Sequence, residues 1–334
     1  MEGEGGGSRK LPEVVLFRHP QHFYLTDTPL PTDSFRFLKP YESPHLSLPD
    51  FLTLHCASAE AILTSGGFPV PYDSISRLPS LRLVLTTSAG LNHIDLSECR
   101  RRGIAVASAG DVYSADVADF AVGLLIDVLR RVSAADRWVR RGVWREGDGG
   151  GREYPLGFKL GGKRVGIVGL GRIGLQVAKR LEPFGCKILY TSRKEKPTTP
   201  YPFYPNVLEL SSNSDVLVIC CGLNEETRHM INKQVMLALG KDGVIINIGR
   251  GNIIDEVEMV KLLVQGELGG AGLDVFENEP HIPKELIAMD NVVLSPHKAV
   301  LTPESMLDIC KLMVGNLEAF FSNRPLLSPV LLDE

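Results

Sequence analysis

Residues 163–196 read KRVGIVGLGRIGLQVAKRLEPFGCKILYTSRKEK, and this stretch decides the fold. A short apolar run at 165–168 predicts a buried parallel strand. The turn GLGRIG follows directly, and apolar residues then recur at helical spacing on one face. A second strand is expected over 186–190. The order strand, glycine turn, helix, strand predicts the opening unit of an α/β sheet.

The three glycines of this turn have separate roles in a dinucleotide-binding site. Gly169 allows the tight turn, Gly171 leaves room for a pyrophosphate, and Gly174 lets the helix pack closely on the strand. The helix N-terminus at Arg172 and Ile173 offers free N–H groups and a positive dipole to the phosphates. An ordinary turn that binds nothing is the alternative. The flanking strand and helix favour dinucleotide binding.

The end of the second strand indicates which dinucleotide is preferred. A site for NAD usually carries an Asp or Glu there, bonded to the ribose 2′-OH. This chain has Ser192, Arg193 and Lys194 instead. A hydroxyl and a guanidinium suit a 2′-phosphate. We therefore expect NADP(H) to be preferred and NAD(H) to bind more weakly, although a solvated basic loop is the alternative.

Composition excludes several classes of protein. The formal net charge of −4 gives no reason to expect affinity for nucleic acid or for an acidic membrane. No apolar run approaches the length of a membrane span. The six cysteines show no metal-binding spacing, so we expect reduced thiols and no metal. The first ten residues resemble a flexible tail more than a signal peptide, and a cytoplasmic location is expected.

Strands and helices alternate along the chain. Residues 18–49 are rich in Pro, Asp, Ser and Thr and predict little regular structure. A long helix is expected over 111–132 and a closing helix over 307–321. Further short apolar runs predict strands over 13–17, 61–64, 81–86, 104–107, 216–220, 244–248, 271–275 and 292–294.

This alternation predicts an α/β fold of two Rossmann-like domains, each built on a doubly wound parallel sheet. At 334 residues the chain has the length of two domains. We expect a discontinuous substrate domain over 1–108, with 299–334 returning to it. A nucleotide-binding domain would occupy 109–298. Closure of the two domains would exclude water from the reaction.

Arg250, Glu279 and His297 follow three successive strands of the predicted nucleotide domain. In open α/β sheets, ligands bind outside the carboxyl ends of the strands, so these side chains should share one edge. They suit reduction of a carbonyl. Arg250 can bind a carboxylate, and His297 can donate a proton because imidazole exchanges protons near neutral pH. Glu279 would orient the imidazole. Each is common singly as a structural residue, but the three together favour catalysis.

Two further segments allow more than one interpretation. Residues 88–95 follow a strand with small residues and a glycine, so they either present backbone N–H groups to an anion or form a plain turn. Residues 137–144 read RWVRRGVW. Trp and Arg are enriched at protein interfaces, which favours an interface here over a nucleic-acid strip. Four glycines between 147 and 151 predict a flexible connection.

The motifs GLGRIG, NIGRGNIID (247–255), GLDVFENEP (272–280) and SPH (295–297) resemble those of the D-isomer-specific 2-hydroxyacid dehydrogenases. The sequence over 116–132, the RWVRRGVW segment and the TSR strand end are similar to plant glyoxylate/hydroxypyruvate reductases and hydroxyphenylpyruvate reductases. The resemblance implies NADPH-dependent reduction of a small 2-oxo acid to the D-2-hydroxy acid. It implies Arg250, Glu279 and His297 as the catalytic residues.

The resemblance also implies how the ligands and a second subunit are bound. Ala89, Gly90 and Leu91 would hold the substrate together with Arg250. A homodimer would be built partly on the 111–132 helix and the Trp-containing segment. Asp274 would contact the nicotinamide carboxamide. The implied cofactor-binding residues are Gly169, Gly171, Arg172, Ile173, Gly174, Ser192, Arg193, Lys194, Cys221, Gly222, Thr227, Ile248, Asp274 and His297.

Some positions depart from the family pattern, and other functions are open. Lys298 follows the predicted proton donor where an apolar residue is usual, and Gly222 stands where many members have Pro. These changes leave the pH optimum and substrate range open. A corepressor-like protein that senses dinucleotides without turnover is one alternative. An NAD-linked dehydrogenase of the phosphoglycerate type is another, although the strand-end Asp that it needs is absent.

Overall fold

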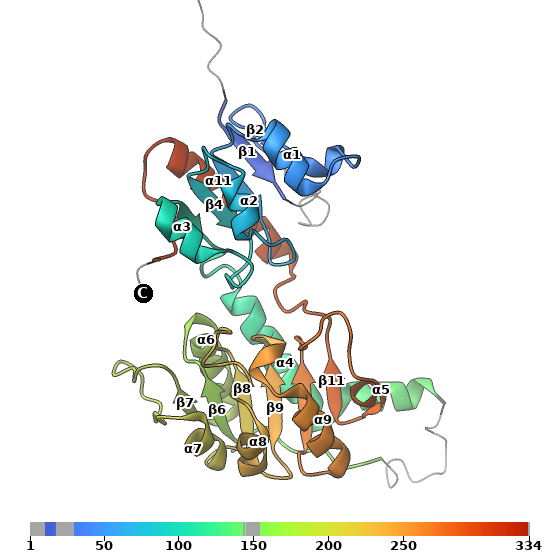
Figure 1. Ribbon diagram of the computed structural model, residues 1–334. Helices are drawn as coiled ribbons and strands as arrows, with labels where there is room; N and C mark the ends of the chain where they lie inside the picture. Colours follow the sequence, from blue (N-terminus) through green and yellow to red (C-terminus); the bar gives the residue numbers. More distant parts are fainter. Residues whose placement is uncertain (1–10, 18–29, 143, 145–153, 333–334) are drawn as a thin grey trace, which may run out of the picture. The chain divides into compact units, whose positions relative to one another are not determined.

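The computed structural model describes residues 11–17, 30–142, 144 and 154–332. Its contacts divide the chain into two compact units. Unit 1 comprises Met1–Tyr113 with Thr302–Glu334, and unit 2 comprises Ser114–Leu301. Each unit contains one parallel β-sheet with helices packed against it (Figure 1). The predicted fold class is thereby confirmed. The predicted N-terminal tail and the glycine connection at 147–151 lie outside the described residues.

The sheet of unit 1 has the order β2-β1-β3-β4-β5, and every neighbouring pair is parallel. Helices α1 (Leu48–His55), α2 (Tyr72–Ser76) and α3 (Leu96–Arg102) share a buried apolar core with these strands. Helix α11 (Pro303–Phe321) packs against β4, so the C-terminal segment completes the unit. The strands are β1 (Glu13–Leu16), β2 (Arg36–Leu38), β3 (Ala61–Thr64), β4 (Leu83–Thr86) and β5 (Ala105–Ala107).

The prediction of little regular structure through residue 49 is wrong where β2 and the start of α1 lie. Strand β2 has three residues and pairs with β1 alone, at the edge of the sheet. Arg36 of β2 forms an ion pair with Glu13 of β1 at 2.9 Å. Three residues are too few to show a period-2 pattern. Strand β2 forms because it pairs with β1, and the local sequence does not predict this pairing.

The sheet of unit 2 has the order β11-β10-β9-β8-β6-β7, again entirely parallel. Strand β6 lies between β7 and β8, so the chain reverses its direction of winding at β6. Such a reversal opens a crevice at the carboxyl ends of the strands. The strands are β6 (Arg164–Val168), β7 (Lys187–Thr191), β8 (Val216–Ile219), β9 (Val244–Asn247), β10 (Gly270–Leu273) and β11 (Val292–Leu294).

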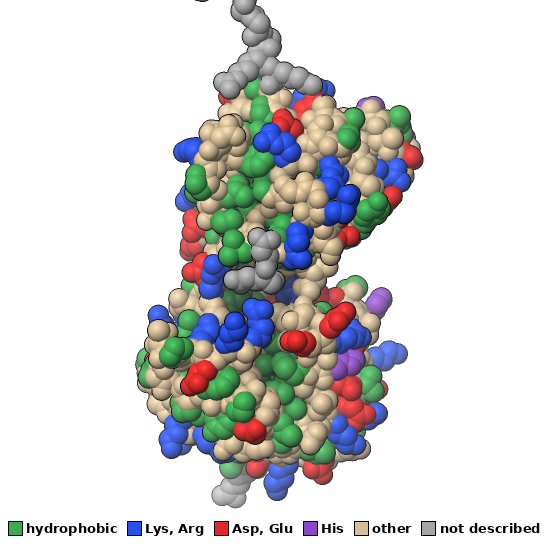
Figure 2. All heavy atoms as spheres, turned by 60° about the vertical axis from the view of Figure 1, so that its left-hand side comes forward, with side chains coloured by type: hydrophobic (Ala, Val, Ile, Leu, Met, Phe, Trp, Pro, Cys, Tyr) green, Lys and Arg blue, Asp and Glu red, His purple; other side chains and the backbone are tan. Residues whose placement is uncertain are grey.

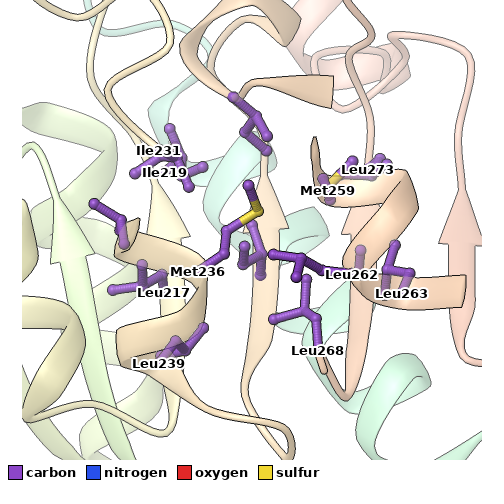
Figure 3. Packing of buried hydrophobic residues seen from close by; sticks show 14 of the residues in the cluster. Leu217, Ile219, Ile231, Met236, Leu239, Met259, Leu262, Leu263, Leu268 and Leu273 are labelled. Atoms are coloured by element: carbon purple, nitrogen blue, oxygen red, sulfur yellow. The ribbon is translucent and has the colours of Figure 1, made fainter. Parts of the chain in front are cut away.

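Helices cover both faces of this sheet. Helices α4 (Ser114–Arg130) and α6 (Arg172–Leu181) pack on each other, and a Cβ at Gly272 would lie 3.2 Å from Leu124 of α4. On the opposite face, Met236, Leu262 and other side chains of α8 (Lys233–Leu239) and α9 (Glu256–Gln265) pack on strand residues (Figure 3). Helices α7 (Val207–Ser212) and α10 (Lys284–Ala288) complete the set. The described helices include none able to cross a membrane.

The helix predicted over 111–132 is α4, which ends two residues before the predicted end, and a second helix that was not predicted follows it. Helix α4 ends at Arg130, and Arg131 adopts a left-handed backbone with φ 57°. Helix α5 (Val132–Arg140) then begins in a new direction, with the backbone N–H of Ser133 donating to Asp127 at 2.7 Å. A left-handed residue interrupts an α-helix whatever the apolar spacing around it.

Candidate functional site

The GLGRIG turn lies at the crevice where the sheet of unit 2 reverses. Gly169 follows β6, and Cys221 lies just beyond the end of the neighbouring strand β8. A Cβ at Gly169 would lie 2.8 Å from the backbone of Cys221, and its φ of +96° is one that other residues rarely adopt. Glycine is therefore required here to bring the two strand ends together.

The start of α6 fits a dinucleotide pyrophosphate. Gly171 is the N-cap of α6 and makes no side-chain capping bond. A Cβ at Gly171 would meet nothing within 4 Å, whereas one at Gly174 would lie 2.3 Å from the carbonyl oxygen of Gly169. The turn is thus tight where the helix packs and open where a phosphate would approach. With the N–H groups of Arg172 and Ile173 at the helix start, this is a suitable anion site.

Alanine substitutions at Gly171 and Gly174 should separate binding from folding. Gly174→Ala is expected to lower Tm by several degrees, because overpacking costs about 1–3 kcal/mol and each 1 kcal/mol corresponds to roughly 2–4 °C. Gly171→Ala is expected to leave Tm unchanged and to weaken NADPH binding at least roughly tenfold. Thermal unfolding and fluorescence titration measure the two effects. Equal NADPH affinity in wild type and Gly171→Ala would contradict the phosphate assignment.

The end of β7 presents the predicted 2′-phosphate residues to solvent. The Ser192 hydroxyl donates to the carbonyl of Lys194 at 2.6 Å, which bends the loop directly after the strand. Arg172, Arg193 and Lys194 are exposed, and Figure 2 shows Lys and Arg side chains gathered on the visible face of unit 2. No carboxylate stands at residues 191–194.

Predicted cofactor residues also follow β8 and β9. The Thr227 hydroxyl donates to the carbonyl of Gly222 at 2.8 Å and so closes a short turn. Ile248 is buried at the end of β9. Burial raises the pKa of the Cys221 thiol to about 11, so it is neutral near pH 7. Cys221 is therefore an apolar lining residue rather than a nucleophile.

His297 and Glu279 are brought together from different strand ends. Nδ1 of His297 and Oε2 of Glu279 lie 2.8 Å apart. Oε1 of Glu279 accepts the backbone N–H of Phe276 at 3.0 Å. Burial would raise the pKa of Glu279, but the bonds to His297 and Phe276 outweigh it and hold that pKa below its usual value. The carboxylate thus stays charged and engages Nδ1 of His297, which leaves Nε2 on the far side of the ring.

The backbone of His297 is held in an unusual conformation. Its φ is 55°, in the left-handed region that non-glycine residues seldom occupy. The His297 N–H donates to the carbonyl of Asp274 at 2.8 Å. The buried carboxylate of Asp274 accepts the N–H groups of Lys298 at 2.8 Å and Ala299 at 3.0 Å. Asp274 therefore fixes the loop that presents the imidazole, and its contact with the nicotinamide stays a prediction.

Arg250 lies at the end of β9 and within electrostatic reach of Glu279. Its carbonyl accepts the side-chain N–H of Asn247 at 3.0 Å, and its guanidinium donates to the carbonyl of Gly249 at 2.7 Å. Burial lowers the pKa of Arg250, while the charge of Glu279 acts to raise it. Arginine remains a cation under such shifts. A half-buried cation beside a His–Glu pair is suited to bind a small carboxylate.

The predicted substrate residues Ala89, Gly90 and Leu91 belong to unit 1, whereas the catalytic candidates belong to unit 2. They follow β4 in a loop that is tied back to that strand. The Thr86 hydroxyl accepts the N–H of Ser88 at 3.2 Å and lies 2.9 Å from Nε2 of His93. The loop is therefore ordered by local bonds. Within the described ranges, no three His, Cys, Asp or Glu side chains are grouped to hold a metal ion.

The sequence interpretation missed Glu277 and His229, whose side chains meet at 2.8 Å; Glu277 lies in the loop that carries the candidate Glu279. The two residues are 48 positions apart. The only sequence signal for Glu277 is its place in FENEP, next to the motif that carries Glu279. Nothing in the periodicity of the chain points to His229.

The sequence of this chain is similar to a known family of dehydrogenases and to two plant reductases. Residues 122–299 match the model for the NAD-binding domain of D-isomer specific 2-hydroxyacid dehydrogenases. A glyoxylate/hydroxypyruvate reductase of Arabidopsis thaliana is 56% identical over 323 residues, which cover 96% of this chain and 98% of the relative. A hydroxyphenylpyruvate reductase of Plectranthus scutellarioides is 50% identical, covering 84% of this chain and 88% of the relative.

A solved structure is also similar over nearly the whole chain. It is the NADPH-dependent glyoxylate/hydroxypyruvate reductase of Sinorhizobium meliloti, in complex with NADP and malonate. The TM-score is 0.86 at 34% sequence identity. The similarity covers 97% of this chain and 98% of the solved chain.

Proposed function

Because the chain belongs to the D-isomer-specific 2-hydroxyacid dehydrogenase family, we propose that it reduces a small 2-oxo acid to the D-2-hydroxy acid with NADPH. The predicted family is confirmed, and the chain is an oxidoreductase that uses a nicotinamide dinucleotide. The candidate substrates are glyoxylate, hydroxypyruvate and hydroxyphenylpyruvate. The observation that carries the proposal is the 2.8 Å pair of His297 and Glu279 at the same sheet edge as the GLGRIG turn.

The side chains supply what carbonyl reduction needs besides the hydride. When bound, the nicotinamide cofactor supplies the hydride to the carbonyl carbon. Arg250 binds the substrate carboxylate and polarises the adjacent carbonyl. His297 donates the proton to the carbonyl oxygen through Nε2, as the carbonyl becomes an alcohol. Glu279 holds Nδ1 and stabilises the charged imidazole before the transfer. One 2-oxo acid, one NADPH and one proton thus give one 2-hydroxy acid and one NADP⁺.

The preference for NADPH rests on the end of β7. Ser192, Arg193 and Lys194 stand where an NAD site usually carries a carboxylate. A carboxylate there would repel a 2′-phosphate, whereas Arg193 offers a planar set of donors to it. The exposed Lys194 adds a second cation. We therefore assign the 2′-phosphate to this loop.

Replacing Ser192 with Asp and Arg193 with Ala should reverse the cofactor preference. The new carboxylate would accept the ribose 2′-OH of NADH and repel the 2′-phosphate of NADPH. The variant loses a charge-assisted bond to NADPH and gains one to NADH, and each such bond is worth about 1.5–3 kcal/mol. We therefore expect the ratio of kcat/KM for NADPH to kcat/KM for NADH to fall at least roughly 100-fold. Steady-state kinetics with both cofactors measure this ratio. Lys187→Ala, on an exposed residue at the other end of β7, is a suitable control. An unchanged ratio would refute the assignment.

We further propose a homodimer that uses the surface around α5. Trp144 is 62% exposed and Leu156 is 90% exposed, and Val132, Val139 and Phe158 also expose apolar surface. Trp138 packs on Tyr154, with ring centroids 5.8 Å apart, so the segments that carry this surface are held together. Exposed apolar residues concentrated in one region are typical of interfaces. Light scattering coupled to size exclusion should give twice the chain mass, and a monomer at micromolar concentration would exclude the dimer.

The direct test of the proposed function is oxidation of NADPH by the purified protein. Glyoxylate, hydroxypyruvate and 4-hydroxyphenylpyruvate are assayed in parallel, each with NADPH and with NADH. We expect turnover of at least one acid, with NADPH used more efficiently. Folded protein that binds NADPH but turns over none of the three would contradict the proposal.

A further inference from the structure

A cluster of polar side chains lies beside the catalytic residues without belonging to them. We define the Glu277 cluster as Glu277, His229, Asn252, Arg228 and Glu256. Oε1 of Glu277 lies 2.8 Å from Nε2 of His229 and accepts the side-chain N–H of Asn252 at 3.3 Å. Arg228 approaches the same oxygen at 3.7 Å. The Glu277 side chain is only 16% exposed, so its charge is satisfied mainly by these partners.

The backbone of Glu277 is fixed as well as its side chain. Its N–H donates to Oε2 of Glu256 at 3.1 Å. Glu256 is the first residue of α9 and is buried, and this burial raises the pKa of its carboxyl group. Glu277 is thus held at two points, by α9 through the main chain and by His229 through the side chain.

The cluster joins the two loops that carry Arg250 and Glu279. A Cβ at Gly251 would lie 1.9 Å from the carbonyl carbon of Phe276 and 2.3 Å from the nitrogen of Glu277. The loop after β9 therefore lies directly against the loop after β10. The contact is one residue from Arg250 and two residues from Glu279 in sequence. Glu277 therefore lies at the contact between the loop that carries Arg250 and the loop that carries Glu279.

A third segment supports the same contact. The N–H of His229 donates to the carbonyl of Asn252 at 2.8 Å, and the N–H of Ile231 donates to the carbonyl of Ile253 at 3.0 Å. The segment after β8 is therefore paired to the segment after β9. His229 has φ 51°, a left-handed backbone that turns its ring toward Glu277. Its side chain then bridges from the β9 loop to the β10 loop.

We infer that Glu277 and His229 are positioning residues that set the distance and orientation of the Arg250 guanidinium relative to the Glu279–His297 pair. This inference rests on the proposed function, because Arg250 is taken to bind the substrate carboxylate. None of the contacts of Glu277 and His229 described above involves the turn GLGRIG or the end of β7. Loss of the contact between Glu277 and His229 should therefore weaken turnover of the oxo acid and leave binding of the cofactor unchanged.

The matched variants are His229→Gln and His229→Leu. Both replacements have an unbranched Cβ, and both must adopt the same left-handed backbone at residue 229. Only glutamine has a side-chain N–H that can reach Glu277 as Nε2 of histidine does. For His229→Leu we expect kcat/KM for the oxo acid to fall roughly 10- to 100-fold, because small misplacements of binding groups have effects of this size. His229→Gln should recover most of the loss. KM for NADPH and the pH optimum should match wild type in both.

Two further variants separate positioning from folding. Arg228→Ala removes an exposed partner at 3.7 Å and should change kcat/KM less than about fivefold, because exposed ion pairs contribute at most about 1 kcal/mol. Asn252→Ala removes one bond to Glu277 and gives a milder variant if His229→Leu does not fold. It should raise KM for the oxo acid with NADPH affinity unchanged. Equal losses in His229→Gln and His229→Leu, or a parallel loss of NADPH affinity, would overturn the inference.

Hydrogen exchange distinguishes failure of this inference from failure of the proposed function. In Asn252→Ala and His229→Leu, peptides covering 249–256 and 275–281 should exchange faster together, while peptides covering 165–176 should not change. If wild type reduces no oxo acid but this paired change is seen, the proposed function fails and the link between the loops stands. If wild type is active and the two peptides do not respond together, the positioning role is wrong.

Discussion

Replacing His297 with alanine is expected to lower kcat for 2-oxo acid reduction roughly 10²- to 10⁴-fold, the range that a positioned general acid contributes. Nδ1 of His297 is engaged by Glu279 at 2.8 Å, which leaves Nε2 as the proposed proton donor. NADPH should still bind, since the turn at Gly169 and the end of β7, which carry most of its predicted contacts, are built from other strands. Stopped-flow and steady-state measurements of NADPH oxidation test the effect.

Glu279→Gln is the companion to this variant. Its amide retains an acceptor for His297 but loses the charge that stabilises the protonated ring, so the loss should be smaller than in His297→Ala. The bond to His297 helps to hold the pKa of Glu279 below its usual value. The bond therefore stabilises the fold fully at a pH above the ordinary carboxyl pKa. This stabilisation is lost as the pH falls through the lowered pKa of Glu279. A His297→Ala variant with activity close to wild type would remove histidine from the mechanism.

Replacing Arg250 with alanine is expected to lower kcat/KM for the oxo acid roughly 10²- to 10³-fold, similar to the loss of one donor from an oxyanion site. Arg250→Lys should recover little, because an ammonium cannot make the paired bonds of a guanidinium to a carboxylate. Initial rates over a wide range of oxo acid concentration separate the effects on KM and kcat.

The control for Arg250 is binding of NADPH in the absence of substrate. Fluorescence titration should give the wild-type Kd for both variants, because Arg250 is assigned to the oxo acid, and its guanidinium donates to the carbonyl of Gly249. A variant that loses NADPH affinity as strongly as oxo acid turnover would show that Arg250 supports the fold of the crevice. In that case its assignment to the substrate carboxylate would fail.

The strands of both sheets could be predicted because buried parallel strands are short apolar runs that end at polar residues. This pattern also placed Arg250, Glu279 and His297 at strand ends, and the structure brings the last two into contact. Strand β2 was missed because three residues carry no period. Helix α5 was missed because Ala134 is its only buried residue, so it carries little apolar periodicity.

The support for the catalytic loops could not be predicted, because it depends on contacts across distant parts of the chain. His229 meets Glu277 across 48 residues, and Asp274 caps Lys298 and Ala299 across 24 and 25 residues. Such contacts depend on strand order, which local sequence does not encode. The glycine roles were predictable for the opposite reason: Gly169 and Gly174 act within one turn, on atoms only a few residues away or on the adjacent strand.

The central claim is that this chain delivers hydride and proton to a 2-oxo acid to form the D-hydroxy acid. The most direct measurement is chiral analysis of the product formed from hydroxypyruvate and NADPH by the wild-type protein. We expect D-glycerate in an amount equal to the NADPH consumed, and at most about a hundredth as much from His297→Ala over the same interval. L-glycerate, or NADPH binding without any glycerate from this or the other candidate acids, would contradict it.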